Sequence, residues 1–306
     1  MPNWNEILTE HNQLIKQHEN AIISVSDTIR RKYLQELFGF TNRNVICYYS
    51  GWLSKPYSQE MSITDEDKNG LMMAVHQMDR SLGLDLILHT PGGSLAASQS
   101  LIDYLHRMFG NNIRAIVPQI SMSAGTIMSC SCKSIVMGKQ SNLGPIDPQI
   151  NGTSAYSILD EFQQAYDEMK TDQARALIWH PILNKYAIGF FKTVEDTVKL
   201  ANDFVQKQLV TCMFEGETDA EEKARHITDK LSAIDTNRQH DRHIHIDECK
   251  ELGLKIEDLE ANSELQDLVL TVHHCFMHTI MNTSAYKLIE NHNGVALVKH
   301  FNNPAR

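Results

Sequence analysis

The chain has 306 residues and a formal net charge of −10, from 28 Lys and Arg against 38 Asp and Glu, and 42% of its residues are hydrophobic. This length and composition are ordinary for a globular protein with a sizeable core. Nucleic-acid binding needs clustered cations, so the acidic balance argues against a nucleic-acid partner and predicts an acidic surface.

The compartment is predicted from the N-terminus and the cysteines. The chain begins without the basic and apolar segments of a secretory signal, and it holds no uninterrupted apolar run of ~18 residues. We therefore expect a soluble protein without a transmembrane segment. Six cysteines are scattered without a disulfide framework, which favours reduced thiols and a cytoplasmic location.

Residues 1–37 are polar and helix-prone, with Arg30, Arg31 and Lys32 near their end. The apolar residues spaced loosely along one helical face are Ile7, Leu14, Ile15, Ile22 and Ile23. We expect an N-terminal helical arm packed on its own domain. The alternatives are an oligomer contact, a regulatory arm or a peripheral contact with a membrane, but three cations alone give weak membrane affinity.

The first strand and helix are predicted ahead of residue 84. Residues 45–49 form a β-rich run that ends before Gly51. A helix over 64–81 is indicated by a Thr64 cap followed by acids, because side-chain oxygens and negative charge stabilise a helix N-terminus. The order along the chain is therefore strand, then helix.

A glycine turn follows the next strand. Residues 84–89 are a short apolar run that ends before Pro91, since proline removes a backbone donor and restricts the residue before it. Gly92 and Gly93 can adopt positive φ and direct bare N–H groups into a pocket. Ser94 stands at the N-cap position of a helix whose apolar residues are Leu95, Leu101, Ile102, Leu105 and Met108.

A serine lies in the next turn. Residues 113–117 and 134–137 predict two more strands, and between them Ser123 precedes Ala124, Gly125 and a short apolar helix. Strands that alternate with helices predict a parallel sheet with right-handed crossovers. Both turns should then meet at the carboxyl edge of the sheet, where such folds bind their ligands.

The remaining elements follow this central unit. Residues 143–149 contain two prolines and predict a rigid loop, and amphipathic helices are expected after it. Residues 215–230 are the most charged stretch and predict a solvated helix or linker. Residues 243–247 alternate like a strand, and residues 291–306 predict an irregular tail.

The two turns point to acyl-transfer chemistry. Such chemistry needs a nucleophile beside N–H donors that face the developing oxyanion. Ser123 could be the nucleophile, and the N–H groups of Gly92 or Gly93 and of Ala124 could be the donors. The alternative is that both are ordinary helix-entry turns whose serines are caps.

Three segments resemble the serine dehydrogenase proteinase family, a branch of the Clp-protease/crotonase fold that also includes signal peptide peptidase A. They are Leu-His-Thr-Pro-Gly-Gly at 88–93, Ser-Ala-Gly-Thr at 123–126 and Leu-Gly-Pro-Ile-Asp-Pro-Gln at 143–149. Stretches at 179–186 and 241–254 also resemble this family, so the likeness covers about residues 28–260.

The resemblance implies an α/β fold, a Clp/crotonase-type spiral of ββα units with a mainly parallel sheet. It implies that Ser123 is the nucleophile, that Gly92 and Gly93 form part of the oxyanion hole, and that a homo-oligomer cleaves peptide or protein substrates. We divide the chain into an N-terminal helical arm (1–37), a catalytic domain (38–260) and a C-terminal helix with a tail (261–306).

The resemblance does not supply the general base. Clp proteases have a His at about the position of Asp147, and the signal-peptide-peptidase branch uses a buried Lys. The other candidates for the base are Lys139, Lys170, Lys185 and His180. We select Lys185, which lies in an apolar segment after Pro181. Asp147 could act on a water, orient a base or cap the next turn.

We expect neither a metal nor a cofactor. His274 and His278 have the i, i+4 spacing that can ligate zinc, but no Glu follows His274 as a hydrolytic motif requires. The predicted activity is that of a serine peptidase acting through an acyl-enzyme at Ser123. The alternatives are another acyl-transfer or thioester enzyme on the same fold, in which Asp147 supplies acid or base, and a catalytically silent oligomeric scaffold.

Overall fold

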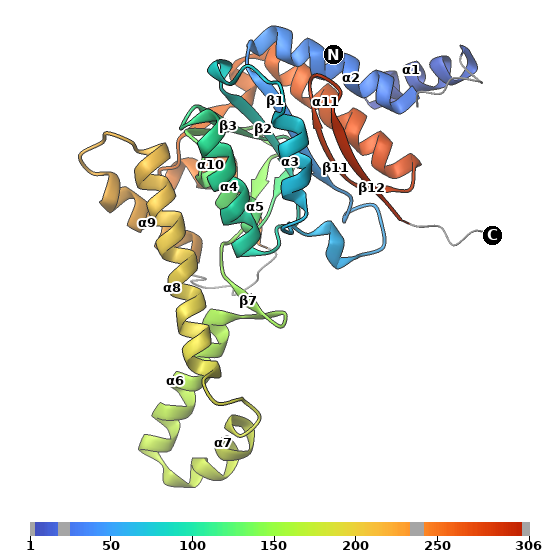
Figure 1. The fold of residues 1–306 in the computed structure, drawn as a ribbon. Helices are drawn as coiled ribbons and strands as arrows, with labels where there is room; N and C mark the ends of the chain where they lie inside the picture. The colour runs from blue at the N-terminus through green and yellow to red at the C-terminus, as the bar shows by residue number, and fades with distance from the viewer. Residues whose placement is uncertain (1–3, 18–24, 233–241, 302–306) are drawn as a thin grey trace, which may run out of the picture.

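The computed structural model describes residues 4–17, 25–232 and 242–301. Its centre is a seven-stranded sheet in the order β10-β5-β3-β2-β1-β11-β12 (Figure 1). The strands are β1 (Asn44–Ser50), β2 (Leu84–His89), β3 (Ile113–Val117), β5 (Ser134–Met137), β10 (Ile256–Asp258), β11 (Ala285–Asn291) and β12 (Ala296–His300). The first five pair in parallel, whereas β11 and β12 are antiparallel. The predicted α/β fold with a mainly parallel sheet is confirmed.

Helices cover both faces of this sheet. One face packs on α3 (Asp67–Val75), α4 (Leu95–Phe109) and α5 (Ala124–Cys130), and the other on α2 (Val25–Thr41) and α11 (Ser263–Asn282). Alternate residues of β1 enter the two cores, with Tyr48 on the first side and Tyr49 on the second. Because both faces are covered, strands β1 and β2 are buried throughout and read as nearly continuous apolar runs.

The N-terminal helix α1 (Trp4–Gln17) packs on the α2 and α11 side, as predicted for its own domain. Ile7 is buried there, and Tyr33 OH donates to Glu10 Oε2 at 2.7 Å. Arg30 is buried too and pairs with Glu290 on β11, so this cation belongs to the interior. Ile22 and Ile23 lie outside the described residues.

One prediction about the later chain was wrong, and two were right only in part. The tail predicted from residue 291 contains strand β12, which pairs with β11. The charged stretch 215–230 is not a solvated linker, because α9 (Ala220–Ser232) buries one face in the main core. The strand predicted over 243–247 is limited to β9 (Ile244–His245), and α10 (Ile246–Glu251) begins directly after it.

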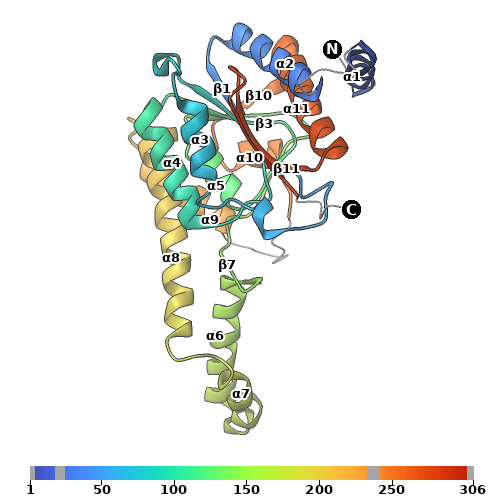
Figure 2. The same cartoon turned by 45° about the vertical axis from the view of Figure 1, so that its right-hand side comes forward.

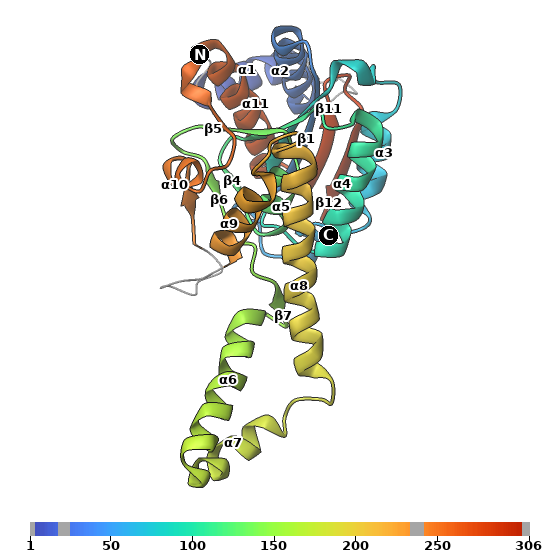
Figure 3. The same ribbon diagram turned by 90° about the vertical axis from the view of Figure 1, so that its left-hand side faces the viewer.

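A helical arm projects from the carboxyl side of the sheet. It consists of α6 (Ala155–Thr171), α7 (Ala176–Leu183) and the first part of α8 (Phe190–Gln208), with α7 farthest from the sheet (Figures 1, 2 and 3). The last part of α8 returns to the main core through Val205. We call residues 155–200 the arm.

Short strands complete the structure. A second sheet has the order β4-β6-β9, with β4 (Ile120–Ser121) and β6 (Asn142–Leu143) parallel, and β7 (Gln149–Ile150) forms a hairpin with β8 (Thr153–Ser154). All six cysteines are buried free thiols. None of the helices in the described part of the chain is both long and apolar enough to cross a membrane.

Candidate active site

The glycine turn after β2 is held tightly against a neighbouring segment. Gly92 and Gly93 have φ values of +93° and +151°, so both occupy backbone conformations that favour glycine. Ile63 N–H donates to Gly92 O at 2.7 Å, and Ser94 N–H donates to Ile63 O at 3.0 Å. A Cβ on Gly93 would lie 2.3 Å from Ile63 N, and therefore no side chain fits there. Ser94 caps α4 as predicted, because its hydroxyl accepts from Ala97 N–H at 3.2 Å.

Ser123 occupies the N-cap position of α5 with unusual backbone angles. Its φ and ψ are +51° and −115°, a conformation that L-residues rarely adopt. Its side chain makes no capping bond, and its hydroxyl has no hydrogen-bond partner among the described residues. Strained residues of this kind cluster at functional sites. The hydroxyl is thus presented to the cavity rather than used to stabilise the helix.

The two turns are in direct contact. Met122 N–H donates to Thr90 O at 3.0 Å, which joins the end of β4 to the end of β2. A Cβ on Gly92 would lie 2.7 Å from Ser123 Cβ and 2.6 Å from Met122 O. The absence of a side chain at residue 92 is what allows the serine turn to approach the glycine turn.

Two backbone donors at this junction are unused. Gly93 N–H and Ala124 N–H have no acceptor among the residues that the structure describes. Gly92 N–H, in contrast, donates to Thr90 Oγ1 at 3.1 Å, and Gly92 is buried. Of the three residues predicted for the oxyanion hole, Gly93 and Ala124 therefore have the available donors, and Gly92 provides the close approach.

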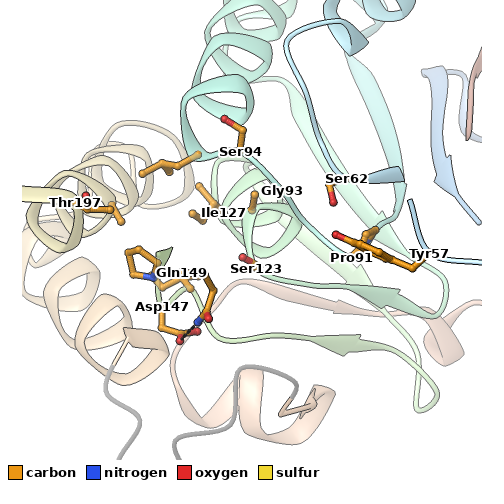
Figure 4. A pocket seen from close by; sticks show the side chains of 15 residues that line it. Tyr57, Ser62, Pro91, Gly93, Ser94, Ser123, Ile127, Asp147, Gln149 and Thr197 are labelled. Atoms are coloured by element: carbon orange, nitrogen blue, oxygen red, sulfur yellow. Dashed lines mark hydrogen bonds between the residues drawn. The ribbon is translucent and has the colours of Figure 1, made fainter. Parts of the chain in front are cut away.

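These groups line a cavity of about 470 Å³ at the carboxyl edge of the sheet (Figure 4). Asp147 and Gln149 come from the predicted rigid loop, and Thr197 comes from α8. Figure 4 shows Ser123 and Asp147 on the wall of the same cavity. Thr126 Oγ1 fixes the loop beside the serine helix, since it accepts from Gly144 N–H at 3.0 Å.

A family comparison identifies the type of site. The sequence model of the ClpP-like SDH-type serine proteinases matches residues 50–283, which include both turns, the loop with Asp147 and the whole arm. The chain belongs to this family. The match agrees with the resemblance noted for the three motifs.

Two relatives of this chain come from Methanocaldococcus jannaschii. The uncharacterized protein MJ0137 is 30% identical over 197 residues, which are 64% of this chain and 60% of the relative. The uncharacterized protein MJ1495 is 28% identical over 194 residues, which are 63% of this chain and 59% of the relative. The chain thus spans less than two thirds of the length of these relatives.

Asp147 is the carboxylate that the fold brings to the cavity. It is 1% exposed, and its Oδ2 accepts from Gln149 Nε2 at 2.7 Å. The other ionisable side chain on the described cavity wall belongs to Tyr57, which is largely exposed. Asp147 is therefore the buried carboxylate that shares the described cavity wall with Ser123.

The structure does not bring the predicted Lys185 to this cavity. Lys185 is exposed and follows α7, the helix of the arm that lies farthest from the sheet (Figure 3). The helices of the arm carry it away from the strand edge that holds Ser123. The other proposed bases that do not line the cavity are Lys139, Lys170 and His180. Within a single chain, Lys185 has no geometric support as the base.

Sequence reasoning missed the segment before α3. Ser62 lines the cavity, and Ile63 anchors the glycine turn on both sides of Gly93. No local motif marks these residues, because their role depends on a parallel bridge between segments 30 residues apart. The Thr64 cap predicted for the following helix was wrong, because α3 begins at Asp67 with Glu66 at its N-cap, and the buried Thr64 Oγ1 has no hydrogen-bond partner in the described part of the chain.

Proposed function

We propose that this chain is a serine peptidase whose nucleophile is Ser123. The observation that carries the proposal is a serine hydroxyl without a hydrogen-bond partner among the described residues, on a strained backbone. The serine lines a cavity together with Gly93 and Ala124, whose N–H groups have no acceptor among the described residues. That pairing meets the two requirements of acyl transfer, an accessible nucleophile and preorganised donors for an oxyanion. A role as helix cap, the alternative for Ser123, would use the hydroxyl in a backbone hydrogen bond.

The proposed reaction has two halves. Ser123 Oγ attacks the peptide carbonyl carbon, its proton passes to a base, and the carbonyl electrons move onto the oxygen, which receives hydrogen bonds from Gly93 and Ala124 N–H. The carbon–nitrogen bond then breaks, and the amine leaves with the proton. Water attacks the resulting ester in the same way and releases the acid and the free serine. We assign Asp147 to accept or orient this proton.

Labelling of the serine tests the proposal. A fluorophosphonate probe forms a phosphonyl ester with an activated serine, and mass spectrometry locates it. We expect labelling at Ser123 and a loss of at least about 10³-fold in Ser123→Ala. Ser129→Ala is the matched control, because Ser129 lies on the same helix α5 with its buried hydroxyl bonded to Gly125 O at 2.9 Å. No labelling of the wild type, or equal labelling of Ser123→Ala, would contradict the proposal.

Substrate class is tested on protein that has not been treated with the probe, because the probe blocks the serine. We expect hydrolysis of fluorogenic peptides and no comparable hydrolysis of acyl-coenzyme A thioesters. The reverse preference would favour a thioester enzyme on the same fold. A protein that neither labels nor hydrolyses either substrate would be a scaffold.

We further propose that the protein is a homo-oligomer that contacts a second copy through the arm. Leu177 is 82% exposed and Ile188 is fully exposed at the far end of this arm, and large apolar residues are costly to leave in water. Light scattering at micromolar concentration should give a multiple of the 34.8 kDa chain mass. Leu177→Ser with Ile188→Ser should lower that mass, and a monomeric wild type would overturn the proposal.

A further inference from the structure

A buried ion pair lies behind the cavity. Lys287 on β11 places Nζ 2.9 Å from Asp67 Oδ1 on α3, and the two side chains are 1% and 0% exposed. Tyr48 OH donates to Asp67 Oδ2 at 2.8 Å. Burial lowers the pKa of Lys287, and the Asp67 carboxylate opposes this effect. Desolvation of two charges can cost more than their attraction returns, so stability alone does not explain such a pair.

The ion pair binds the backbone on both sides of Ile63. Lys287 Nζ donates to Ser62 O at 2.7 Å. Asp67 Oδ2 accepts from Thr64 N–H at 2.9 Å. Both bonds involve charged groups, which makes them stronger than bonds between neutral groups. The segment 62–64 is thus fixed by two charges that lie outside the cavity.

Ile63 carries this anchoring to the glycine turn. Its N–H and its C=O bond to Gly92 O and Ser94 N–H, the residues directly before and after Gly93. A continuous series of hydrogen bonds therefore connects Lys287 and Asp67 with the peptide groups that orient Gly93 N–H. Donors to an oxyanion must hold their position to within about 0.5 Å to be effective.

We propose that Asp67 and Lys287 are positioning residues that fix the Gly93 N–H for oxyanion stabilisation. This inference rests on the proposed function, because Gly93 N–H has an oxyanion to bind only if Ser123 is a nucleophile. Neither residue lines the cavity, so both act through segment 62–64. The effect should appear in the rate of chemistry rather than in substrate binding.

The molecule contains a matched control pair on the same strand. Glu290, three residues after Lys287 on β11, is 0% exposed and pairs with the equally buried Arg30 of α2. Its side chain faces the α2 and α11 side, where Arg30 Nη1 donates to Thr279 Oγ1 at 2.9 Å. None of these residues lines the cavity or bonds to segment 62–64. Loss of this pair should disturb the fold without moving Gly93.

The test compares Asp67→Asn and Lys287→Met with Glu290→Gln. For the first two we expect fluorophosphonate labelling and kcat on a peptide to fall about 10- to 100-fold, with KM changed less than about threefold, since a weakened oxyanion donor costs transition-state stabilisation. For Glu290→Gln we expect both rates within about twofold of wild type and a lower Tm. Near-UV circular dichroism establishes whether each variant is folded. If Lys287→Met does not fold, the nearly isosteric Asp67→Asn alone tests the inference.

A second measurement separates this inference from the proposed function. The amide ¹⁵N and ¹H chemical shifts of Gly93 should change in Asp67→Asn and stay unchanged in Glu290→Gln, whether or not the protein is a peptidase. Unchanged Gly93 shifts, unchanged rates in the folded Asp67→Asn, or an equal loss of rate in Glu290→Gln would overturn the inference. If the probe did not label the wild type but the Gly93 amide shifts changed in Asp67→Asn, the proposed function and the catalytic purpose of the positioning would be overturned. The anchoring of Gly93 by Asp67 would stand in that case.

Discussion

The sheet and the arm differ in how much of their surface is covered. Strands β1, β2 and β11 are buried from end to end, and ion pairs as well as apolar side chains fix them. The arm has five buried apolar residues, Ala155, Ile158, Ala165, Trp179 and Val194, and only Ala155, Ile158 and Val194 form a core cluster. Small cores contribute little stability, so the arm should open locally far more often than the sheet.

The sheet and the arm contribute different parts of the cavity. The turns that hold Ser123 and Gly93 belong to the rigid sheet, where close packing maintains donor geometry to a fraction of an ångström. The arm contributes Thr197 of α8 to the cavity wall and exposes large apolar residues, such as Leu177 and Ile188, away from it. Under the proposed function, the sheet would therefore hold the reacting groups, and the arm would offer surface to a substrate or a second copy.

The largest expected difference between the regions concerns two glycines with positive φ. Gly93→Ala should destabilise the protein by at least about 3 kcal/mol and abolish labelling, because the new Cβ would overlap Ile63 N in a strained conformation. Gly189→Ala in the arm should lower the free energy of unfolding by about 1 kcal/mol and preserve labelling. Gly189 also has a positive φ, of +82°, but no atom lies within 4 Å of the position of the new Cβ.

Urea unfolding and the labelling rate measure both effects. The turn at residue 93 would not be rigid if the two alanine variants had equal stability and labelled equally. A large loss in Gly189→Ala alone would show that the arm is the better-packed region.

A smaller effect concerns pH and a histidine behind the glycine turn. His89 is buried, its Nδ1 and Nε2 lie 3.1 Å from the carbonyl oxygen of Ser50 and 3.0 Å from Gln119 Oε1, and its ring stacks on Tyr49. Burial lowers the pKa of His89 from 6.5 to about 4, against opposing hydrogen bonds. The unfolded chain then binds a proton that the folded chain does not, so stability is complete above about pH 6.5 and falls by about 3 kcal/mol as the pH decreases toward 4.

Replacement of the histidine isolates this dependence from that of other groups. Urea midpoints from pH 7.5 to 4.5 should fall less steeply in His89→Gln than in wild type, while the neighbouring His273, whose pKa burial also lowers, retains part of the slope. His180→Gln in the exposed arm should leave the wild-type profile unchanged. Parallel profiles for wild type and His89→Gln would show that His89 is not held neutral.

The smallest effect is expected at the lysine first selected as the base. Lys185→Ala should leave the labelling rate within about twofold of wild type, because exposed surface substitutions rarely alter a distant site. Asp147→Asn in the cavity provides the comparison and should slow labelling. A strong loss of labelling in Lys185→Ala would contradict this expectation and would show that Lys185 acts at the cavity. Lys185 does not line the cavity within one chain.

Local signals in the sequence were sufficient for the turns. The strand before Pro91, the glycine pair and the Ser94 cap were predicted at the residues where the structure has them, because φ preferences and capping act over a few residues. Ser123 was predicted at the start of a helix for the same reason. Its free hydroxyl and its strained backbone could not be predicted, since they depend on contact with Gly92 from another turn.

The distant pairings were decided only in the tertiary structure. Residues 285–291 contain Lys287, Glu290 and Asn291, and a strand with so many polar residues gives no signal of a buried position in the sequence. It is buried because Asp67 and Arg30, 220 and 260 residues away, neutralise its charges. The sequence alone thus determined strands β1, β2, β3 and β5, the two turns and the nucleophile candidate. The fold decided which donors are free, which carboxylate shares their cavity and which lysine is too far away, because those depend on contacts between segments remote along the chain.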